Sequence, residues 1–211
     1  MAASLGGYDE RVSDVPASSG PWTRHTRRVA YDNPWVVVYH DEVTRPDGGP
    51  GIYGVVHFRN VAAGVVVLDP ADRILLVGQH RYTLDEYSWE IPEGGVPPDE
   101  DPLEGARREL REETGIEAAE WAELARYTLS NSITDERALT WLAWGLSPAP
   151  RAPDETEVIA VARVPFTALM REIERGAIRD ALTVATALRA YHMAREHLLP
   201  GWLAHAMLTR V

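Results

Sequence analysis

Three glutamates in one short segment have the spacing of a metal-binding helix face. Glu109, Glu112 and Glu113 stand at positions i, i+3 and i+4, so on an α-helix they fall within a wedge of roughly 100°. Like charges at this spacing destabilise an isolated helix by about 0.2–0.5 kcal/mol per pair, and a hard divalent cation with oxygen ligands would offset that repulsion. Arg108 precedes Glu112 by four residues and can hold its carboxylate in place. The helical wheel alone leaves a solvated acidic face open as the alternative.

The helix that carries these glutamates is predicted over residues 102–114. Proline stands in its first turn and Gly115 just past its end, which is where these two residue types usually limit a helix. The stripe expected to face the core consists of Leu103, Ala106 and Leu110. The face expected to be solvated consists of Glu104, Arg107 and Arg111. The acidic wedge lies beside the apolar stripe and away from the solvated face.

A longer pattern surrounds this helix. It reads Gly94-x5-Glu100-x7-Arg108-Glu109-Leu110-x-Glu112-Glu113-x-Gly115-Ile116. All nine specified positions match the signature of the nudix hydrolases, so the chain resembles that family; the probability of a chance match is on the order of 10⁻⁷. The resemblance implies hydrolysis of a nucleoside diphosphate linked to another group, with Mg²⁺ or Mn²⁺ bound on the signature helix.

The resemblance also implies a role for each residue of the signature. The expected metal ligands are the side chains of Glu109, Glu112 and Glu113 and the backbone carbonyl of Glu93. Arg108 would orient the glutamates, with Glu100 in support. A bound cation would neutralise pyrophosphate oxygens and lower the pKa of a bound water. Gly94 would let the backbone approach the metal site closely.

From about residue 22 to residue 192 the chain is similar to the ADP-ribose and nucleoside-diphosphate-sugar pyrophosphatase branch of this family. The segments that carry this similarity are Glu90 to Gly95 (EIPEGG), Asp154 to Glu157 (DETE) and the Gly-x-Ile-x-Asp-Ala run at Gly176 to Ala181. In the branch the acidic loop supplies the general base or another metal ligand. Here that residue would be Glu155 or Glu157, which the sequence does not separate. An ordinary charged turn is the alternative for this loop.

Several residues are candidates for substrate binding through the same resemblance. Arg81 matches an arginine that pairs with substrate phosphate, and a guanidinium fork suits a diphosphate; a salt-bridged surface arginine is the alternative. Trp22 and Trp35 are candidates to stack on the base, because N-terminal strands in this branch help to sandwich it through a partner subunit. The remaining substrate-binding candidates are Glu136 and Arg59.

One loop departs from the pattern of the branch. ADP-ribose pyrophosphatases carry Ser-Pro-Gly about fifteen residues after the signature and then a glutamate, whereas this chain has Ser130-Asn131-Ser132 followed by Glu136. The loop shapes the pocket for the group beyond the second phosphate. Another nucleoside-diphosphate sugar is therefore comparable with ADP-ribose as the substrate.

Composition excludes several other classes of protein. The chain has 211 residues, 45% of them hydrophobic, and a formal net charge of −11. This charge disfavours a nucleic-acid groove, which needs the opposite sign. With no cysteine, disulfides, zinc–thiolate sites and thiol catalysis are excluded. The chain has no run of 18 apolar residues and no signal segment, so we expect a soluble cytoplasmic protein without a membrane partner.

The expected fold class is α/β. The resemblance implies a nudix α/β/α sandwich with a mixed β-sheet, preceded by a small antiparallel β region. We predict a flexible tail at 1–21, a β region at 22–60 that supports a homodimer, a hydrolase domain at 61–200 and a C-terminal tail at 201–211. Strands are predicted at 22–31, 35–43, 52–58, 64–68, 74–77, 121–129, 138–146 and 158–164, and further helices at 166–175 and 181–197.

These patterns favour a metal-dependent pyrophosphatase that releases a nucleoside monophosphate and a sugar phosphate. A nudix enzyme for a dinucleotide or a damaged nucleotide is the second possibility. A non-catalytic sensor of ADP-ribose-like ligands is the third. Such sensors usually gain a DNA-binding domain or lose signature carboxylates, whereas all the signature carboxylates are present here.

Overall fold

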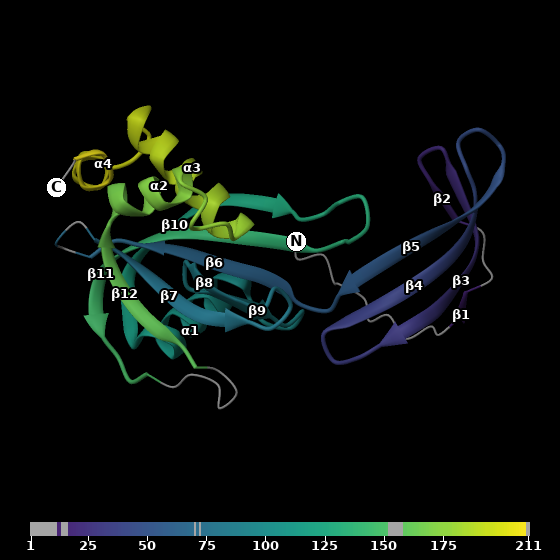
Figure 1. The fold of residues 1–211 in the computed structure, drawn as a ribbon, viewed down its shortest axis with the longest axis horizontal. Helices are drawn as coiled ribbons and strands as arrows, with labels where there is room; N and C mark the ends of the chain where they lie inside the picture. The colour runs from purple at the N-terminus through teal and green to yellow at the C-terminus, as the bar shows by residue number, and fades with distance from the viewer. Residues whose placement is uncertain (1–11, 14–16, 70, 72, 152–157, 210–211) are drawn as a thin grey trace. The chain divides into compact units, whose positions relative to one another are not determined.

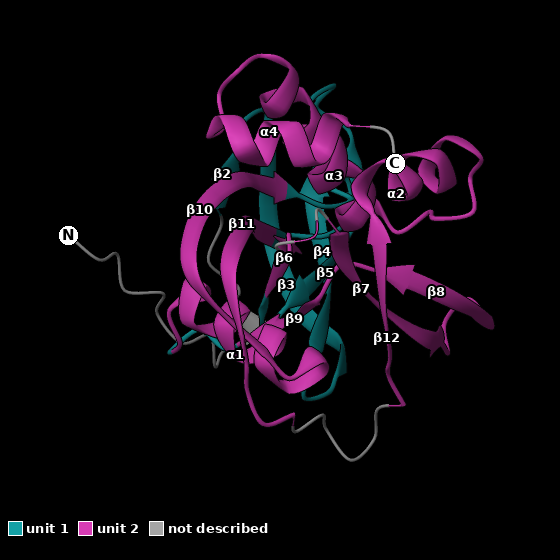
Figure 2. Cartoon of the chain, turned by 90° about the vertical axis from the view of Figure 1, so that its left-hand side faces the viewer, with its two compact units in different colours: residues 1–61, 97–99, 128–137 teal, residues 62–96, 100–127, 138–211 magenta. Residues whose placement is uncertain are grey.

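The structure, a computed structural model, describes residues 12–13, 17–69, 71, 73–151 and 158–209. The chain divides into two compact units (Figure 2). The first unit comprises residues 1–61, 97–99 and 128–137, and the second comprises residues 62–96, 100–127 and 138–211. Segments 97–99 and 128–137, assigned above to the hydrolase domain, thus belong to the first unit. For 128–137 the reason is that its backbone hydrogen-bonds to a strand of that unit.

The first unit contains a five-stranded antiparallel sheet (Figure 1). Its strands are β1 (Val12–Ser13), β2 (Ala17–Ser19), β3 (Trp22–Asp32), β4 (Val36–Thr44) and β5 (Pro50–Phe58). The order is β1-β3-β4-β5, and β2 also pairs with β3. The predicted flexible tail at 1–21 needs correction here, because its described residues form β1 and β2. Their backbone groups find partners on β3, in a hairpin for β2 and across about sixteen residues for β1, and composition does not indicate this pairing.

Side chains of β4 alternate between the two faces of this sheet, as a half-buried strand requires. Val37, Tyr39, Asp41 and Val43 are buried. The buried Asp41 carboxylate accepts two hydrogen bonds of 2.7 Å from Arg27, whose guanidinium lies 4.4 Å from the centre of the Tyr39 ring. The one buried charge of the strand is therefore neutralised within the sheet.

The second unit has two sheets and four helices (Figure 1). One sheet has the order β10-β11-β6-β9, the other β12-β7-β8. Its strands are β6 (Val61–Val67), β7 (Arg73–Arg81), β8 (Glu86–Glu90), β9 (Glu93–Val96), β10 (Ile116–Thr128), β11 (Arg137–Pro148) and β12 (Ala160–Pro165). The helices are α1 (Pro102–Thr114), α2 (Phe166–Glu174), α3 (Ala181–Arg195) and α4 (Gly201–Leu208). Because β6 and β11 are parallel while β7 is antiparallel to both neighbours, the predicted α/β class with mixed strands is confirmed.

Strand β6 separates two hydrophobic cores. Its residues Ala63, Val65 and Val67 pack in one cluster with Leu110 of α1. Val66 packs in the other cluster, with residues of α2, α3 and α4. Side chains of a strand alternate in direction, so this one strand joins the layer of α1 to the layer of the C-terminal helices.

The predicted C-terminal tail at 201–211 is corrected by helix α4. Leu203, Ala204, Ala206 and Met207 of this helix are buried in the core with α2 and α3. The segment is apolar on several sides, so the helical periodicity that would have revealed it is weak. None of the helices in the described ranges has the length and apolar character needed to cross a bilayer.

Substituting Gly105 in α1 is expected to destabilise the protein. A Cβ atom there would lie 2.3 Å and 2.7 Å from the two γ-carbons of the buried Val96 on β9. Gly105→Ala gains about 1 kcal/mol of helix propensity, whereas overpacking a close-packed core costs about 1–3 kcal/mol. We expect a net fall in Tm by calorimetry. In Gly201→Ala, where nothing lies within 4 Å of the new Cβ, Tm should not fall; equal effects would contradict the clash.

Candidate active site

Helix α1 begins and ends where its local signals predict. The Asp101 side chain accepts from the backbone N–H of Leu103 at 2.9 Å and caps the first turn. Gly115 ends the helix in the left-handed conformation, at φ +69°. Its apolar stripe packs into the core with β9, which turns the acidic wedge toward the Gly94 segment.

The three glutamates of the wedge differ in burial. Glu113 is only 2% exposed, and its Oε2 accepts from the backbone N–H of Glu93 at 3.2 Å. Glu109 and Glu112 are partly exposed. A Cβ on Gly94 would fall 2.2–2.5 Å from the carboxylate of Glu109, so only glycine leaves that carboxylate where it lies.

Arg108 holds these carboxylates in place. Its Nη1 lies 2.7 Å from Glu109 Oε1 and 3.1 Å from Glu112 Oε2. Its Nε and Nη2 donate to Glu100 at 3.1 and 3.0 Å, and these hydrogen bonds are the main reason that the pKa of Arg108 is raised. The predicted pairing with Glu112 is present, together with the support from Glu100 that the resemblance implies.

The carboxyl group of Glu93 is the unsatisfied group of this region. Its Oε2 is buried and has no hydrogen-bond partner among the residues that the structure describes. Burial raises the pKa of Glu93 well above its usual range, and the negative charges of Asp180, Glu90 and Glu113 act in the same direction. The charge of Arg81 opposes them. The region therefore has more negative charge than its two arginines neutralise.

This donor set fits a hard divalent cation. Within the described ranges no three His, Cys, Asp or Glu side chains are already gathered as a coordination shell, because Arg108 occupies Glu109 and Glu112. The carboxylates, the orphaned oxygen of Glu93 and the nearby backbone are nevertheless all oxygen donors, the type that Mg²⁺ and Mn²⁺ prefer. A cation would offset the negative charges that, after burial, raise the pKa of Glu93.

Arg81, at the end of β7, is already paired. Its Nε donates to Glu90 Oε1 at 3.0 Å and its Nη2 donates to the second oxygen of the same carboxylate. Nη2 also lies 3.9 Å from Glu93 Oε1. The hydrogen bond to Glu90 is the main reason that the pKa of Arg81 is raised. Arg81 therefore has the geometry of the salt-bridged alternative, but its partner Glu90 is only 3% exposed. The sequence did not identify Glu90 as this partner.

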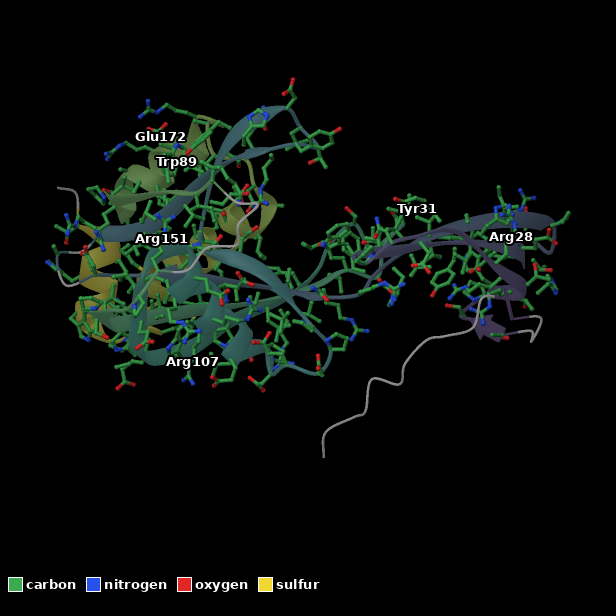
Figure 3. All side chains as sticks on the ribbon, turned by 90° about the horizontal axis from the view of Figure 1, so that it is seen from below. Arg28, Tyr31, Trp89, Arg107, Arg151 and Glu172 are labelled. Atoms are coloured by element: carbon green, nitrogen blue, oxygen red, sulfur yellow. The ribbon has the colours of Figure 1, made fainter. Side chains whose placement is uncertain are left out.

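A second residue that sequence reasoning missed is Arg151 (labelled in Figure 3). Its Nε donates to the backbone carbonyl of Glu113 and its Nη2 to that of Ile159, both at 2.7 Å. It thus ties the end of α1 to the chain just before β12. The predicted base candidates Glu155 and Glu157 lie outside the described residues. The signal that could have identified Arg151 is its residue type, because an arginine can donate to the last carbonyls of a helix.

The first unit contains a cavity of about 520 Å³. Its lining residues include Trp22, Arg24, Tyr53 and the loop Asn131–Asp135. The Trp22 and Tyr53 rings meet edge to face, with centroids 5.3 Å apart. Arg24 contributes a buried Nε for which the described part of the chain offers no hydrogen-bond partner. The structure therefore brings Trp22 together with the loop that departs from the branch pattern, and adds Arg24 and Tyr53, which sequence reasoning missed.

The other substrate-binding candidates do not line this cavity, as far as the structure describes the chain. Trp35 is 70% exposed in the turn between β3 and β4. Arg59 lies near the same turn, where it pairs with Asp32 and donates to the carbonyl of Asn33. Glu136 follows the lining loop, and burial, with the charge of Asp135 beside it, raises its pKa.

Comparisons with known proteins assign both parts of the chain. Residues 58–186 match the NUDIX domain, and residues 22–56 match the nucleoside diphosphate sugar hydrolase N-terminal domain. An ADP-ribose pyrophosphatase of Mycobacterium tuberculosis is 33% identical over 155 residues, which cover 72% of this chain and 74% of that protein. A methanol dehydrogenase activator of Bacillus methanolicus is 31% identical over 146 residues, or 68% of this chain and 78% of that protein. A crystal structure described as an ADP compounds hydrolase has the same fold, with a TM-score of 0.77 at 20% identity, covering 86% of this chain and 98% of that one.

Proposed function

The chain belongs to the NUDIX family, and on that basis we propose that it hydrolyses the pyrophosphate bond of a nucleoside diphosphate sugar. The substrate is ADP-ribose or a related compound, and the products are a nucleoside monophosphate and a sugar phosphate. The observation that carries this proposal is the wedge of Glu109, Glu112 and Glu113 on α1, packed against Gly94 and oriented by Arg108. The match of residues 22–56 and the name of the mycobacterial relative support the substrate class.

The residues of α1 hold the cofactor in this proposal. Glu109, Glu112 and Glu113, with the carbonyl of Glu93, bind Mg²⁺ or Mn²⁺. When bound, such a cation neutralises pyrophosphate oxygens and lowers the pKa of a bound water. Arg108 keeps the carboxylates of Glu109 and Glu112 aligned, as its distances to them indicate.

The proposal assigns proton removal from the attacking water to Glu155 or Glu157. Both residues follow Arg151, whose hydrogen bonds join the carbonyls of Glu113 and Ile159. These bonds fix the two ends of the segment that carries the base candidates relative to α1. We include Arg151 in the proposed site for this reason.

Substrate recognition is divided between a cation and an aromatic side chain. Arg81 binds the diphosphate, since its side chain remains partly exposed although its Nε and Nη2 pair with Glu90. In the homodimer, Trp22 in the cavity of the first unit stacks on the base bound by the partner subunit, with Glu136, Trp35 and Arg59 as further substrate-binding residues. In this proposal the enzyme is a cytoplasmic homodimer whose subunits are joined through the N-terminal strands.

Arg81→Ala is expected to raise KM for the diphosphate sugar about tenfold or more, with a smaller effect on kcat, because it removes a charge-assisted contact to phosphate. It also leaves the buried Glu90 without its partner, which lowers stability. The double variant Arg81→Ala/Glu90→Gln separates the two effects. Tm should recover while KM stays raised; a KM that returns to the wild-type value would remove Arg81 from the substrate site.

A substrate panel tests the proposed function. Phosphate release is measured with Mg²⁺ and Mn²⁺ on ADP-ribose, GDP-mannose, UDP-glucose, NADH, diadenosine polyphosphates and nucleoside triphosphates, coupled to a phosphatase that attacks only the products. We expect a clear preference for one diphosphate sugar, abolished by EDTA and restored by either metal. Preference for a dinucleotide or a triphosphate would contradict the substrate class. Tight binding of ADP-ribose without turnover would favour a sensor.

A further inference from the structure

The loop that lines the cavity is joined to strand β5 by backbone hydrogen bonds. The N–H of Val56 donates to the carbonyl of Ile133 at 2.9 Å, and the N–H of Asp135 donates to the carbonyl of Val56 at 3.3 Å. Val56 and Thr134 form an isolated parallel bridge. The segment between β10 and β11 thus extends the edge of the N-terminal sheet over a few residues.

Side chains of β5 reinforce this junction at two points. The carboxylate of Asp135 lies with Oδ2 2.5 Å from His57 Nδ1, while its Oδ1 accepts from the N–H of Phe58 at 3.1 Å. The hydroxyl of Tyr53 donates to the carbonyl of Ser132 at 2.7 Å. Two neighbouring residues of β5 therefore hold one end of the loop, and Tyr53 holds its tip.

Among the described residues, the other hydrogen bonds of the loop are local: the N–H groups of Ile133 and Thr134 donate to the carbonyl of Ser130 at 2.9 and 3.0 Å, and the Thr134 hydroxyl donates to the carbonyl of Leu129 at 2.6 Å. Asn131, Ser132 and Ile133 are exposed. Ser130 has a left-handed backbone, at φ +43°, which a non-glycine residue adopts only where its surroundings determine it. A segment with few buried contacts belongs to the least stable part of a fold. The local bonds shape the turn, whereas the contacts from β5 tie it to the N-terminal sheet.

The same loop forms one wall of the cavity that contains Trp22 and Tyr53. Its position therefore sets the shape of that cavity. We propose that His57 and Tyr53 are positioning residues, which hold loop Asn131–Asp135 so that the cavity selects among nucleoside diphosphate sugars. This inference rests on the proposed function. His57 acts through Asp135, whereas Tyr53 acts both through Ser132 and by its ring against Trp22.

Removing the contacts that hold loop Asn131–Asp135 should weaken substrate binding and leave the rate of the chemical step unchanged. If only the held loop binds substrate, apparent affinity falls by the fraction of molecules in which the loop is held. A fall in that fraction to about one tenth raises KM about tenfold with kcat unchanged. The glutamates of α1 belong to the other unit and keep their contacts in such variants.

The variants for the test are His57→Ala, Asp135→Ala and their combination, with His25→Ala as the matched control. His25 belongs to the same sheet and contacts Thr44 at 2.7 Å across β3 and β4, away from the loop. Amide hydrogen exchange followed by mass spectrometry reports on the N–H groups of Val56 and Asp135. We expect faster exchange in His57→Ala, Asp135→Ala and the double variant, and wild-type exchange in His25→Ala. Exchange in the double variant should be no faster than in Asp135→Ala, because both substitutions act through one contact.

Kinetics with ADP-ribose and GDP-mannose complete the experiment. The expected result is a KM raised about tenfold for the preferred sugar, and less for the other, at constant kcat. Amide hydrogen exchange that is unchanged in the variants would overturn the role of His57 and Asp135 in holding the loop. Faster exchange with KM unchanged for both sugars would overturn the role in selection. If the wild-type protein turns over no nucleoside diphosphate sugar of the panel, the proposed function fails and selection fails with it, while exchange still decides whether His57 holds the loop.

Discussion

Glu113→Gln is expected to lower kcat about 10³-fold while the protein folds normally. A metal ion contributes several kcal/mol to a phosphoryl transition state, and each 1.36 kcal/mol is tenfold in rate. The amide keeps the shape of the carboxylate and an oxygen that can accept from the N–H of Glu93. It removes one negative charge from a buried cluster in which Glu113 contributes to the raised pKa of Glu93. Stability should therefore stay level or rise.

The control for this variant lies on the same helix. Glu104→Gln makes the same substitution on the exposed face of α1, where Glu104 pairs only with Arg107 among the contacts that the structure describes. Its kcat should equal that of the wild type. Calorimetric titration with Mn²⁺ gives a readout that does not depend on turnover, and we expect weaker binding in Glu113→Gln alone. Wild-type turnover in Glu113→Gln would exclude Glu113 from the ligand set.

The sequence predicted α1 to the residue because its signals are local. Pro102 and Gly115 limit the helix, and the pairing of Arg108 with Glu112 follows from their spacing of four residues. Each of these features depends on atoms within one or two helical turns. Local geometry is enough to place them, and strands in the first half with one helix in the middle and two at the end indicate mixed α/β layers.

Features that depend on distant residues could not be predicted in this way. The cavity of the first unit combines residues of β2, β3, β4 and β5 with the loop Asn131–Asp135, in which Ser132 lies 79 residues beyond Tyr53 of β5. Trp22 was a candidate to stack on the base and Asn131 marked the loop that departs from the branch pattern, but nothing in the sequence indicated that they line one cavity. The pairing of Arg81 with Glu90 likewise required the hairpin of β7 and β8. The weak hydrophobic periodicity of α4 likewise gave no sign that this segment is a helix buried in the core.

Gly94→Ala is expected to lower kcat about 100-fold or more with little loss of stability. The new Cβ would lie 2.2 Å from Cδ of Glu109, so one of the two must move. The end of a glutamate side chain moves more easily than backbone, and the carboxylate would leave its position 2.7 Å from Arg108 Nη1. A displacement of about 1 Å at a catalytic group can reduce the rate 10²-fold. Activity should therefore fall at nearly unchanged Tm.

A second substitution separates displacement of the carboxylate from a disturbed backbone. In Gly94→Ala/Glu109→Asp the acidic side chain is one methylene shorter, so its carboxylate can lie beside the new methyl group. We expect kcat to recover in part, although Glu109→Asp alone should lose activity because it withdraws a ligand from an otherwise intact site. Recovery in the double variant would mean that the two substitutions compensate through one contact. If the double variant were instead as impaired as the product of the two single effects, Gly94 would act on the backbone and not on Glu109, and the close contact between them would have no part in holding the cation.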